Sequence, residues 1–324
     1  MPGEPGAPPE TVIQVEDLTK VYGEVRAVDG ISFSVRSGEV FAFLGPNGAG
    51  KTTTVEILES IRTPTEGRIA VFGRDLQESM KSVRERIGVL PQEFRSYDRL
   101  TVRETLQYYQ RLYDGRIWDV DEIIELLGLG EKRDTQYMYL SGGLKQRVGV
   151  GIALVNDPDI VFLDEPTTGL DPRARREVWG IIRLLKGRGK TIFLTTHYME
   201  EAEQLADRVC IIHRGKIIAR GSVGDLLAEH GERRVMRISG CTRKCLVDMA
   251  GDLDIPIGPL DSSPSIPVPD IETAMRVLTY LRESGLEYRE VDIMGPTLED
   301  VFLSLTGEPL ESEPENGLVE SGAE

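Results

Sequence analysis

The sequence predicts an α/β protein with a second, smaller α+β domain, and three observations support this prediction. Short β-rich runs alternate with helical stretches from Thr11 to about residue 230, which is typical of an α/β layer architecture. The later strands are nearly continuous in apolar residues, as expected of parallel strands that are buried on both faces. The length of 324 residues fits about two domains at roughly 150 residues each.

The first domain is expected over residues 11–230. Its β-rich runs predict strands over Val12–Val15, Ile31–Val35, Val40–Leu44, Ile87–Leu90, Ile160–Leu163, Thr191–Thr195 and Val209–Ile212. The stretches between them predict helices over Val55–Ile61, Val102–Leu112, Leu144–Val155, Arg173–Leu185 and Met199–Ala206.

The order of elements changes in the second domain, which is expected over residues 231–307. Strands are predicted over Val235–Ser239, Ile255–Ile257, Ile266–Val268 and Leu286–Met294, and helices over Arg243–Ala250, Ile271–Glu283 and Leu298–Leu305. The first six of these, in chain order, follow the β-α-β-β-α-β order of a ferredoxin-like unit.

Composition restricts the class of protein. Lys and Arg total 38 against 54 Asp and Glu, so nucleic acid is not expected as a partner, because binding phosphate backbones needs a basic surface. Residues 1–10 and 308–324 carry eight Glu and no basic residue, and their Pro-, Gly- and Ser-rich composition predicts disordered tails.

Cysteines and apolar runs indicate the compartment. Three cysteines do not make a disulfide framework, so a reducing compartment is the expectation. Cys241 and Cys245 have no second Cys or His pair nearby, and we do not interpret them as a zinc site. The sequence has no secretory signal and no apolar run long enough to cross a membrane, so we expect a cytoplasmic protein.

A phosphate-binding loop follows the strand Val40–Leu44. The residues are Gly45, Pro46, Asn47, Gly48, Ala49, Gly50, Lys51 and Thr52, and they fit the pattern G-x-x-x-x-G-K-[ST] between a strand and a helix. Backbone N–H groups of such a loop surround an anion, and the following helix directs its positive end at the phosphates. Lys51 would bind the β- and γ-phosphates, and the Thr52 hydroxyl would help to hold Mg²⁺.

Two carboxylates end the apolar strand Ile160–Leu163. Asp164 would lie at the strand tip, where a carboxylate can join the Mg²⁺ shell. Glu165 could orient and deprotonate an attacking water. Solvated acids at a strand end are the plain alternative, and the phosphate loop favours the functional interpretation.

Further short stretches, in the right order, resemble the ATP-binding subunit of an ABC transporter over residues 11–230. The most specific is Leu140–Arg147, which resembles the family signature and carries Leu144 where the family usually has Gln. The other matches are Gln92 with the glutamine loop, Gly169-Leu170-Asp171 with the loop after the acidic strand, His197 with the switch histidine, and Tyr22 with the aromatic that stacks on adenine.

The resemblance implies a P-loop ATPase fold with a helical subdomain and a set of residue roles. Glu165 would be the catalytic base, assisted by Gln92 and His197. The nucleotide would contact Tyr22, the phosphate loop with Thr53, the signature residues Ser141, Gly142 and Gly143, and Asp171. The metal would be held by Thr52, Gln92 and Asp164.

The resemblance also implies partners. Two copies of the chain would close around two MgATP, with the Ser141 loop of one copy facing the phosphate loop of the other. A separate integral membrane permease would bind near Glu93–Thr101 and place the protein on the inner face of the cell membrane. The stretch Gly295–Phe302 resembles a motif of multidrug, antibiotic and lipid or polysaccharide exporters and favours export.

Two alternatives remain open at this point. A non-transport ATPase of the same class, in translation or DNA repair, usually has two cassettes, coiled-coil insertions or basic arms, and this chain has one cassette and none of the rest. A regulatory ATP-sensing protein would instead bind a small effector at residues 233–307. A permease partner distinguishes transport from both alternatives.

Overall fold

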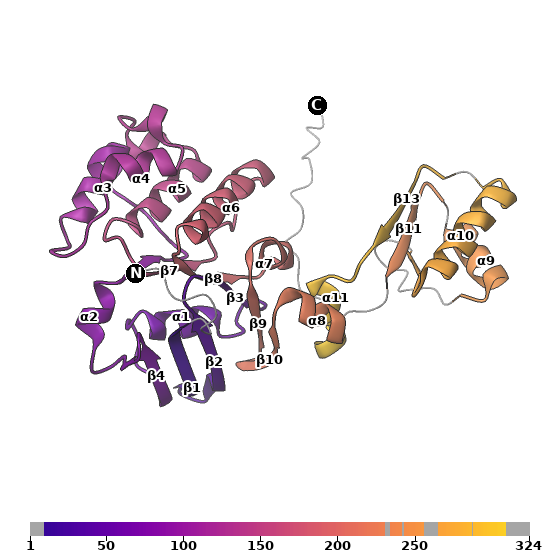
Figure 1. Ribbon diagram of the computed structural model, residues 1–324, viewed down its shortest axis with the longest axis horizontal. Helices are drawn as coiled ribbons and strands as arrows, with labels where there is room; N and C mark the ends of the chain where they lie inside the picture. Colours follow the sequence, from indigo (N-terminus) through magenta and orange to yellow (C-terminus); the bar gives the residue numbers. More distant parts are fainter. Residues whose placement is uncertain (1–9, 231–233, 242, 256–264, 287, 309–324) are drawn as a thin grey trace, which may run out of the picture. The chain divides into compact units, whose positions relative to one another are not determined.

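The computed structural model describes residues 10–230, 234–241, 243–255, 265–286 and 288–308. The chain separates into two compact units, Met1–Val223 and Gly224–Glu324 (Figure 1). The two predicted tails lie almost wholly outside the described residues, as does most of the predicted strand Ile255–Ile257.

A six-stranded sheet forms the centre of the first unit. Its strands, in spatial order, are β10 (Lys216–Gly221), β9 (Arg208–His213), β3 (Val40–Leu44), β8 (Thr191–Thr196), β7 (Ile160–Asp164) and β6 (Ile87–Leu90). All neighbours are parallel except β10, which is antiparallel to β9. The prediction of parallel strands is therefore confirmed, and β10 was not predicted.

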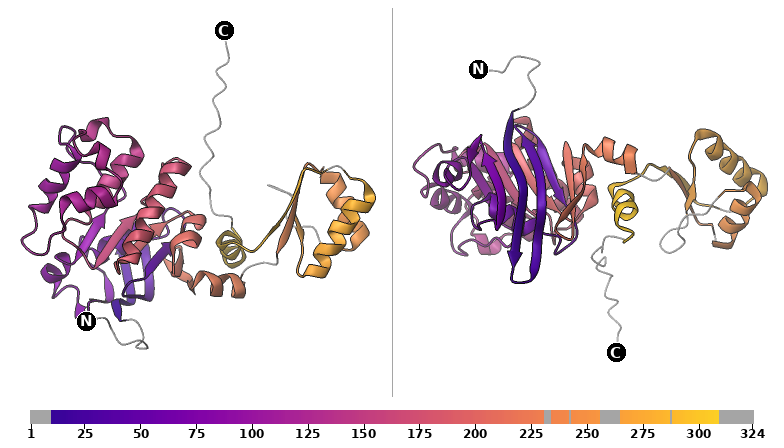
Figure 2. Two further views of the ribbon diagram at one scale, coloured as in Figure 1. Left: turned by 45° about the horizontal axis from the view of Figure 1, so that its top comes forward. Right: turned by 90° about the horizontal axis from the view of Figure 1, so that it is seen from below.

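The first strands of the chain form a separate antiparallel sheet. It contains, in spatial order, β2 (Val25–Arg36), β1 (Thr11–Tyr22), β4 (Glu66–Val71) and β5 (Arg74–Asp75). The predicted strands Val12–Val15 and Ile31–Val35 lie within β1 and β2, which extend well beyond them and also bury Leu18 and Val28. Figure 2 shows these long strands beside the rest of the unit.

The central sheet is buried on both faces because successive side chains of a strand point to opposite sides. Phe162 and Phe193 join the core that packs against β1, β2 and the helix α1 (Lys51–Leu58). Their neighbours Val161 and Leu194 join a second core with the helices on the other face. The near-continuous apolar strands of the sequence are explained by this double burial.

The helices of the first unit cover the sheet and form a group of their own. They are α2 (Met80–Arg84), α3 (Val102–Gln110), α4 (Val120–Leu126), α5 (Gly142–Ile152), α6 (Pro172–Gly187) and α7 (Met199–Leu205), with 3-10 turns at Gly130–Lys132 and Tyr137–Tyr139. Figure 1 shows α3, α4 and α5 together, apart from the strands. Helix α1 begins at Lys51 rather than at the predicted Val55, because the chain enters it directly from the left-handed Gly50.

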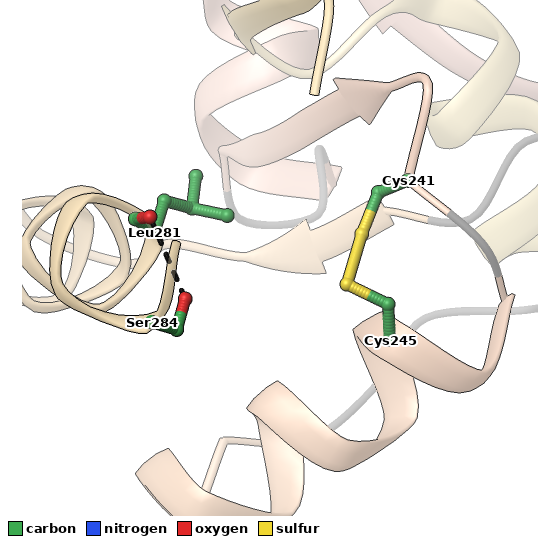
Figure 3. The surroundings of a disulfide bond; sticks show 4 residues. All are labelled: Cys241, Cys245, Leu281 and Ser284. Atoms are coloured by element: carbon green, nitrogen blue, oxygen red, sulfur yellow. Dashed lines mark hydrogen bonds between the residues drawn. A yellow bond between two sulfur atoms is a disulfide. The ribbon is translucent and has the colours of Figure 1, made fainter. Parts of the chain in front are cut away.

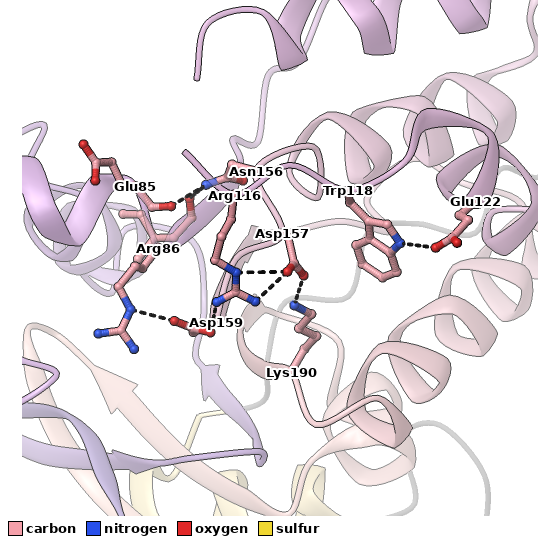
Figure 4. Close-up of polar contacts among 10 residues, drawn as sticks. Glu85, Arg86, Arg116, Trp118, Glu122, Asn156, Asp157, Asp159 and Lys190 are labelled. Carbon is pink, nitrogen blue, oxygen red and sulfur yellow. Dashed lines mark hydrogen bonds and ion pairs between the residues drawn. The ribbon is translucent and has the colours of Figure 1, made fainter. Parts of the chain in front are cut away.

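A cluster of ion pairs lies at the amino ends of β6, β7 and β8 (Figure 4). Asp159 precedes β7 and accepts from Arg86 Nε at 2.6 Å, and Asp157 contacts Lys190 Nζ at 2.5 Å and Arg116. Parallel strands place their amino ends at one edge of the sheet, so this cluster lies opposite the edge at which the predicted site residues gather. We assign it to the stability of the fold.

The second unit contains a small antiparallel sheet with helices on one face. Its elements are α8 (Val223–His230), β11 (Val235–Ser239), α9 (Arg243–Leu253), β12 (Ser265–Pro267), α10 (Ile271–Ser284), β13 (Glu290–Met294) and α11 (Leu298–Thr306), and the strand order is β12-β11-β13. Met236 and Ile238 of β11 pack against Met249 of α9 and Val277 of α10. The elements β11, α9, β12, α10, β13 and α11 follow the predicted order, without the predicted strand Ile255–Ile257, most of which lies outside the described residues.

A disulfide joins Cys241 and Cys245 at the start of α9 (Figure 3). The cysteine count predicted no disulfide framework and a reducing compartment, and this single disulfide was not predicted. Cys210 is the buried free cysteine of β9. Across the described parts of the chain, every helix is too short or too polar to span a membrane.

Candidate functional site

Four predicted residues or loops meet at the carboxyl edge of the parallel sheet. The phosphate loop follows β3, Gln92 follows β6, Asp164 and Glu165 follow the apolar run of β7, and His197 follows β8. Because these strands are parallel, their carboxyl ends lie side by side. The topology thus brings together residues that are far apart in the sequence.

Two glycines of the phosphate loop are required by close backbone contacts. A Cβ atom at Gly45 would lie 2.2 Å from the carbonyl oxygen of Ile212. Gly50 has a φ of 109°, and a Cβ there would lie 2.5 Å from the carbonyl oxygen of Ala27. Gly50 is also the N-cap of α1 and makes no side-chain cap, so the first N–H groups of this helix remain suited to an anion.

Lys51 is buried at the first position of α1, with 4% of its surface exposed. Its ammonium donates to the carbonyl oxygens of Gly45 at 2.8 Å and Pro46 at 3.1 Å. It also lies 3.1 Å from Glu165 Oε1. These contacts hold the positive charge inside the loop that the sequence assigned to phosphate. The loop residues Asn47 and Gly48 are exposed, Thr53 is half-buried and Ala49 is buried.

Oxygen atoms suited to Mg²⁺ lie beside the loop. Asp164 is buried at the end of β7, accepts a hydrogen bond from the Thr195 hydroxyl and lies within hydrogen-bonding reach of Thr52. Burial, and then the nearby Glu165 charge, raise the pKa of Asp164. The Thr52 side chain is exposed. A hydroxyl, a carboxylate and the nearby amide of Gln92 are the hard oxygen ligands that Mg²⁺ prefers, so the predicted metal residues fit this ion.

Glu165 is the centre of the polar contacts. Its Oε2 accepts from Gln92 Nε2 and from the Thr168 hydroxyl, each at 3.2 Å, and lies 3.2 Å from His197 Nδ1. Burial by itself would raise the pKa of Glu165, but contacts with His197 and Lys51 outweigh it and lower that pKa to about 2. The carboxylate is therefore ionised, as a base must be.

The backbone at Glu165 is strained. Its φ of 49° lies in the left-handed region, which costs a non-glycine residue of order 1 kcal/mol or more and persists only when the surroundings impose it. The amide of Glu165 donates to Thr195 Oγ1 at 3.0 Å and to the Thr195 carbonyl oxygen at 3.2 Å. Strain held in this way at a carboxylate is typical of functional sites.

The signature residues lie on a different groove. Ser141 is the N-cap of α5 and accepts from the amide of Leu144 at 3.4 Å. Gly142 is exposed, and a Cβ at Gly143 would lie 2.7 Å from the Cβ of Ala174. An open groove of about 500 Å³ is lined by these residues and by Asp171, and no phosphate-loop residue lines it.

Asp171 caps a helix, and Tyr22 lies beside two basic side chains. Asp171 is the N-cap of α6 and accepts from the amides of Arg173 and Ala174, each at 2.9 Å. Tyr22 ends β1 and is 39% exposed, with the Lys20 ammonium 5.1 Å and the Arg62 guanidinium carbon 5.6 Å from its ring centre. Neither residue contacts the Glu165 cluster directly, and their nucleotide roles remain predictions.

Three further residues of the site were not predicted from the sequence. Thr168 and Thr195 hydrogen-bond to Glu165 and Asp164, and Thr195 could have been noticed as a polar residue in an apolar strand. Glu59 follows α1 and is buried, and burial together with the charges of Asp164 and Glu56 raises its pKa to about 8. Nothing in the local sequence distinguishes Glu59 from an exposed helical acid.

The raised pKa of Glu59 predicts that the stability of the protein depends on pH. The unfolded chain releases this proton near the ordinary pKa of 4.5, and the folded protein keeps it up to about 8. The free energy of unfolding is therefore expected to fall as the pH rises from about 4.5 to about 8. Glu59→Gln should remove this part of the slope, measured by urea unfolding without Mg²⁺ or nucleotide.

The exposed Glu78, on the loop before α2, gives the matched control. Glu78→Gln should leave the pH dependence of the parent protein unchanged. If Glu59→Gln and Glu78→Gln unfold with the same pH dependence, Glu59 is not the group responsible.

The chain is similar to known proteins in both sequence and fold. A family model described as "ABC transporter" matches residues 28–168. The chain is 39% identical to a daunorubicin/doxorubicin resistance ATP-binding protein of Streptomyces peucetius, over 93% of this chain and 94% of the relative. It is 40% identical to a Nod factor export ATP-binding protein of Paraburkholderia xenovorans, over 94% and 99% of the two chains.

Solved structures show the same fold. An ATP-binding subunit of an ABC transporter superimposes with a TM-score of 0.60 at 28% identity, over 68% of this chain and 93% of the other. A dimeric ATP-binding cassette in a post-hydrolysis state with ADP and phosphate superimposes with a TM-score of 0.58 at 25% identity, over 65% and 98%.

Proposed function

The chain belongs to the ATP-binding subunits of ABC transporters, which couple ATP hydrolysis to transport, and from this membership we propose that two copies close around two ATP molecules to drive export through a separate membrane permease. The observation that carries the proposal is the separation of the two anion sites. The phosphate loop lies at the edge of the parallel sheet, and the Ser141 groove has no phosphate-loop residue in its lining.

A second copy would complete the site. Ser141 and Gly142 begin α5, and the N-terminus of an eleven-residue helix attracts an anion. The γ-phosphate held by the loop of one copy would meet this helix of the other, so the nucleotide would join the two chains. The dimeric cassette among the solved relatives supports this arrangement.

The contact between Lys51 and Glu165 would control how strong a base Glu165 is during hydrolysis. The phosphates of ATP would compete with Glu165 for the Lys51 ammonium, because one ammonium has only three donors. Losing part of that contact would raise the pKa of Glu165 from about 2 towards its ordinary value and make it a stronger base. Glu165 would then take a proton from the water that attacks the γ-phosphate, with Gln92 and His197 holding its carboxylate.

The metal would be held by Thr52, Asp164 and Gln92. When bound, Mg²⁺ neutralises charge on the phosphates. Thr195 would orient Asp164 through the hydrogen bond described above. Tyr22, exposed at the end of β1, would stack on the adenine. The side chains of Lys20 and Arg62 lie near the Tyr22 ring and would cover the part of it that the adenine does not.

The second domain, residues 231–307, is proposed to be a ferredoxin-like unit that stabilises or regulates the dimer. The order β11-α9-β12-α10-β13 supplies five of its six elements, and the strand predicted from the sequence at Ile255–Ile257, most of which lies outside the described residues, would be the sixth. Deleting residues 231–324 should change dimer formation or the ATPase rate, and an unchanged rate and dimer would contradict this role.

Export of a small molecule is the proposed direction. The relatives that match nearly the whole chain are named for drug resistance and for Nod factor export. Selectivity would belong to the permease, because the site described above binds only the nucleotide. The protein would lie on the inner face of the cell membrane through that permease.

Co-purification tests the proposal. The tagged chain, isolated from detergent-solubilised membranes, should bring an integral membrane protein with it. Tyr97→Asp should weaken this association, because Tyr97 is 53% exposed within the proposed docking segment. Tyr288→Asp is the control, since Tyr288 is 46% exposed in the second unit. If no membrane protein is recovered and the ATPase responds to a small effector, the sensing alternative is supported.

A further inference from the structure

A buried acid outside the Glu165 cluster connects the segments that carry the site. Glu201 lies in the first turn of α7, four residues after His197, and none of its surface is exposed. An ionised carboxylate in such a place is costly unless it is hydrogen-bonded. Its contacts therefore indicate why an acid rather than an apolar residue occupies this position.

One oxygen of Glu201 accepts two hydrogen bonds from different segments. Thr167 Oγ1 and Trp179 Nε1 each donate to Glu201 Oε1 at 2.8 Å. Both donors are buried, at 0% and 5% exposure. Thr167 lies two residues after Glu165, and Trp179 lies in α6, whose N-cap is Asp171. The carboxyl thus joins the segment after β7, the helix that follows it, and the helix that follows His197.

The hydrogen bonds of Glu201 with Thr167 and Trp179 indicate that this residue holds the surrounding segments in fixed positions and does not only fill space. Burial raises the pKa of the Glu201 carboxyl, and the side chains of Thr196, Trp179 and Thr167 oppose that rise only in part. Removing the acceptor would leave two buried donors without a partner, which is unfavourable because a buried donor loses its hydrogen bond to water as well. Two directional bonds at 2.8 Å also allow less displacement than apolar contacts do.

We propose that Glu201 is a positioning residue for ATP hydrolysis, which fixes the Glu165 segment against the helix that follows His197. The 3.2 Å separation of Glu165 Oε2 and His197 Nδ1 depends on how these two segments sit, and displacements of about 1 Å at such sites can cost about 10²-fold in rate. The proposal rests on the roles proposed above for Glu165 and His197.

Two substitutions at position 201 separate positioning from packing. Glu201→Gln keeps an acceptor oxygen in place, so we expect a kcat within about twofold of the parent. Glu201→Leu keeps the approximate volume and removes the acceptor, so we expect kcat to fall about 10- to 100-fold. The KM and the Kd for ATP should stay unchanged, because the phosphate loop and Lys51 are untouched.

The measurements are made below the melting temperature of each variant, as followed by circular dichroism. Glu200→Leu, an exposed neighbour on the same helix, is the matched control and should leave kcat unchanged. A folded Glu201→Leu variant with normal kcat overturns the proposal. The proposal is also overturned if Glu201→Gln loses as much kcat as Glu201→Leu does. It is likewise overturned if Glu201→Leu raises only the KM.

Substitutions of the two donors, Thr167 and Trp179, provide a second test, which can be made even if Glu201→Leu does not fold. Thr167→Val and Trp179→Phe each remove one hydrogen bond and should each lower kcat by less than Glu201→Leu does. Thr167→Val should add nothing in a Glu201→Leu background, because both remove the same contact. Full additivity of the two losses in kcat would contradict the connection.

The proposed role of Glu165 as the base is tested separately from the positioning role of Glu201. Normal turnover in Glu165→Gln would remove the role of Glu165, whatever Glu201 does. Normal turnover in Glu201→Leu would remove only the positioning role and leave the proposed function intact.

Discussion

Glu165→Gln is expected to lower ATP turnover by about 10²- to 10⁴-fold, the range over which a general base contributes, while ATP binding persists. Glutamine keeps the volume of the side chain and one acceptor oxygen but cannot take a proton from water. The phosphate loop and Lys51 are unaltered, so the Kd for ATP should change little. Phosphate release at saturating ATP, together with direct titration of ATP, measures both quantities.

The same variant should accumulate as a nucleotide-bound dimer, because the phosphate that is proposed to join the two copies would no longer be removed. Size-exclusion chromatography with ATP and Mg²⁺ detects this species. Adding Ser141→Arg should prevent it, since a long side chain at the start of α5 would fill the groove at which the partner's phosphate is expected. Glu131→Gln, at an exposed acid, is the control for substitution alone.

Two results would contradict the assignment. A Glu165→Gln variant that hydrolyses ATP at the parent rate shows that another group is the base. A variant that neither hydrolyses nor binds ATP shows that the substitution has damaged the loop, and the dimer would then be absent as well.

Lys51→Ala is expected to weaken ATP binding by about 100-fold, which corresponds to losing a strong hydrogen bond to a charged group in a buried site. The ammonium contacts the loop carbonyls of Gly45 and Pro46 and the carboxylate of Glu165. Its removal takes away both the positive charge offered to the phosphates and the internal support of the loop. Isothermal titration with ATP measures the loss.

Stability must be followed beside affinity in this case, since the buried Glu165 loses a partner. Lys51→Met retains most of the stem and removes only the charge, so it should lose affinity to a similar extent with a smaller effect on the melting temperature. Lys81→Ala, at an exposed lysine of α2, should leave both quantities unchanged. Parent affinity in a folded Lys51→Met protein would remove the phosphate-loop interpretation.

Features encoded in contiguous residues could be predicted from the sequence. The strands β3, β6 and β11 begin and end at the predicted residues, because each is a short β-rich run with clear flanks. The phosphate loop, the Asp164–Glu165 pair and the start of α5 at the signature are likewise local patterns. Their physical basis is the backbone and the side chains within a few residues.

Features that depend on distant residues could not be predicted. The pKa of Glu59 depends on its burial near Asp164, more than 100 residues away in the chain. The apolar pattern of β1 did not reveal that it belongs to a separate antiparallel sheet, because strands of either sheet bury similar side chains.

The sequence by itself determined the α/β class of the first domain, the family and the set of residues proposed to face the nucleotide, because the loop, the acid pair and the signature are local in the chain. Only the tertiary structure decided which of these residues touch one another. It placed Lys51, Gln92 and His197 around Glu165, set the Ser141 groove apart from the phosphate loop, and buried Glu201 between Thr167 and Trp179. The reason is that parallel strands gather distant chain segments at one edge, and the energies of ion pairs and buried hydrogen bonds depend on those distances.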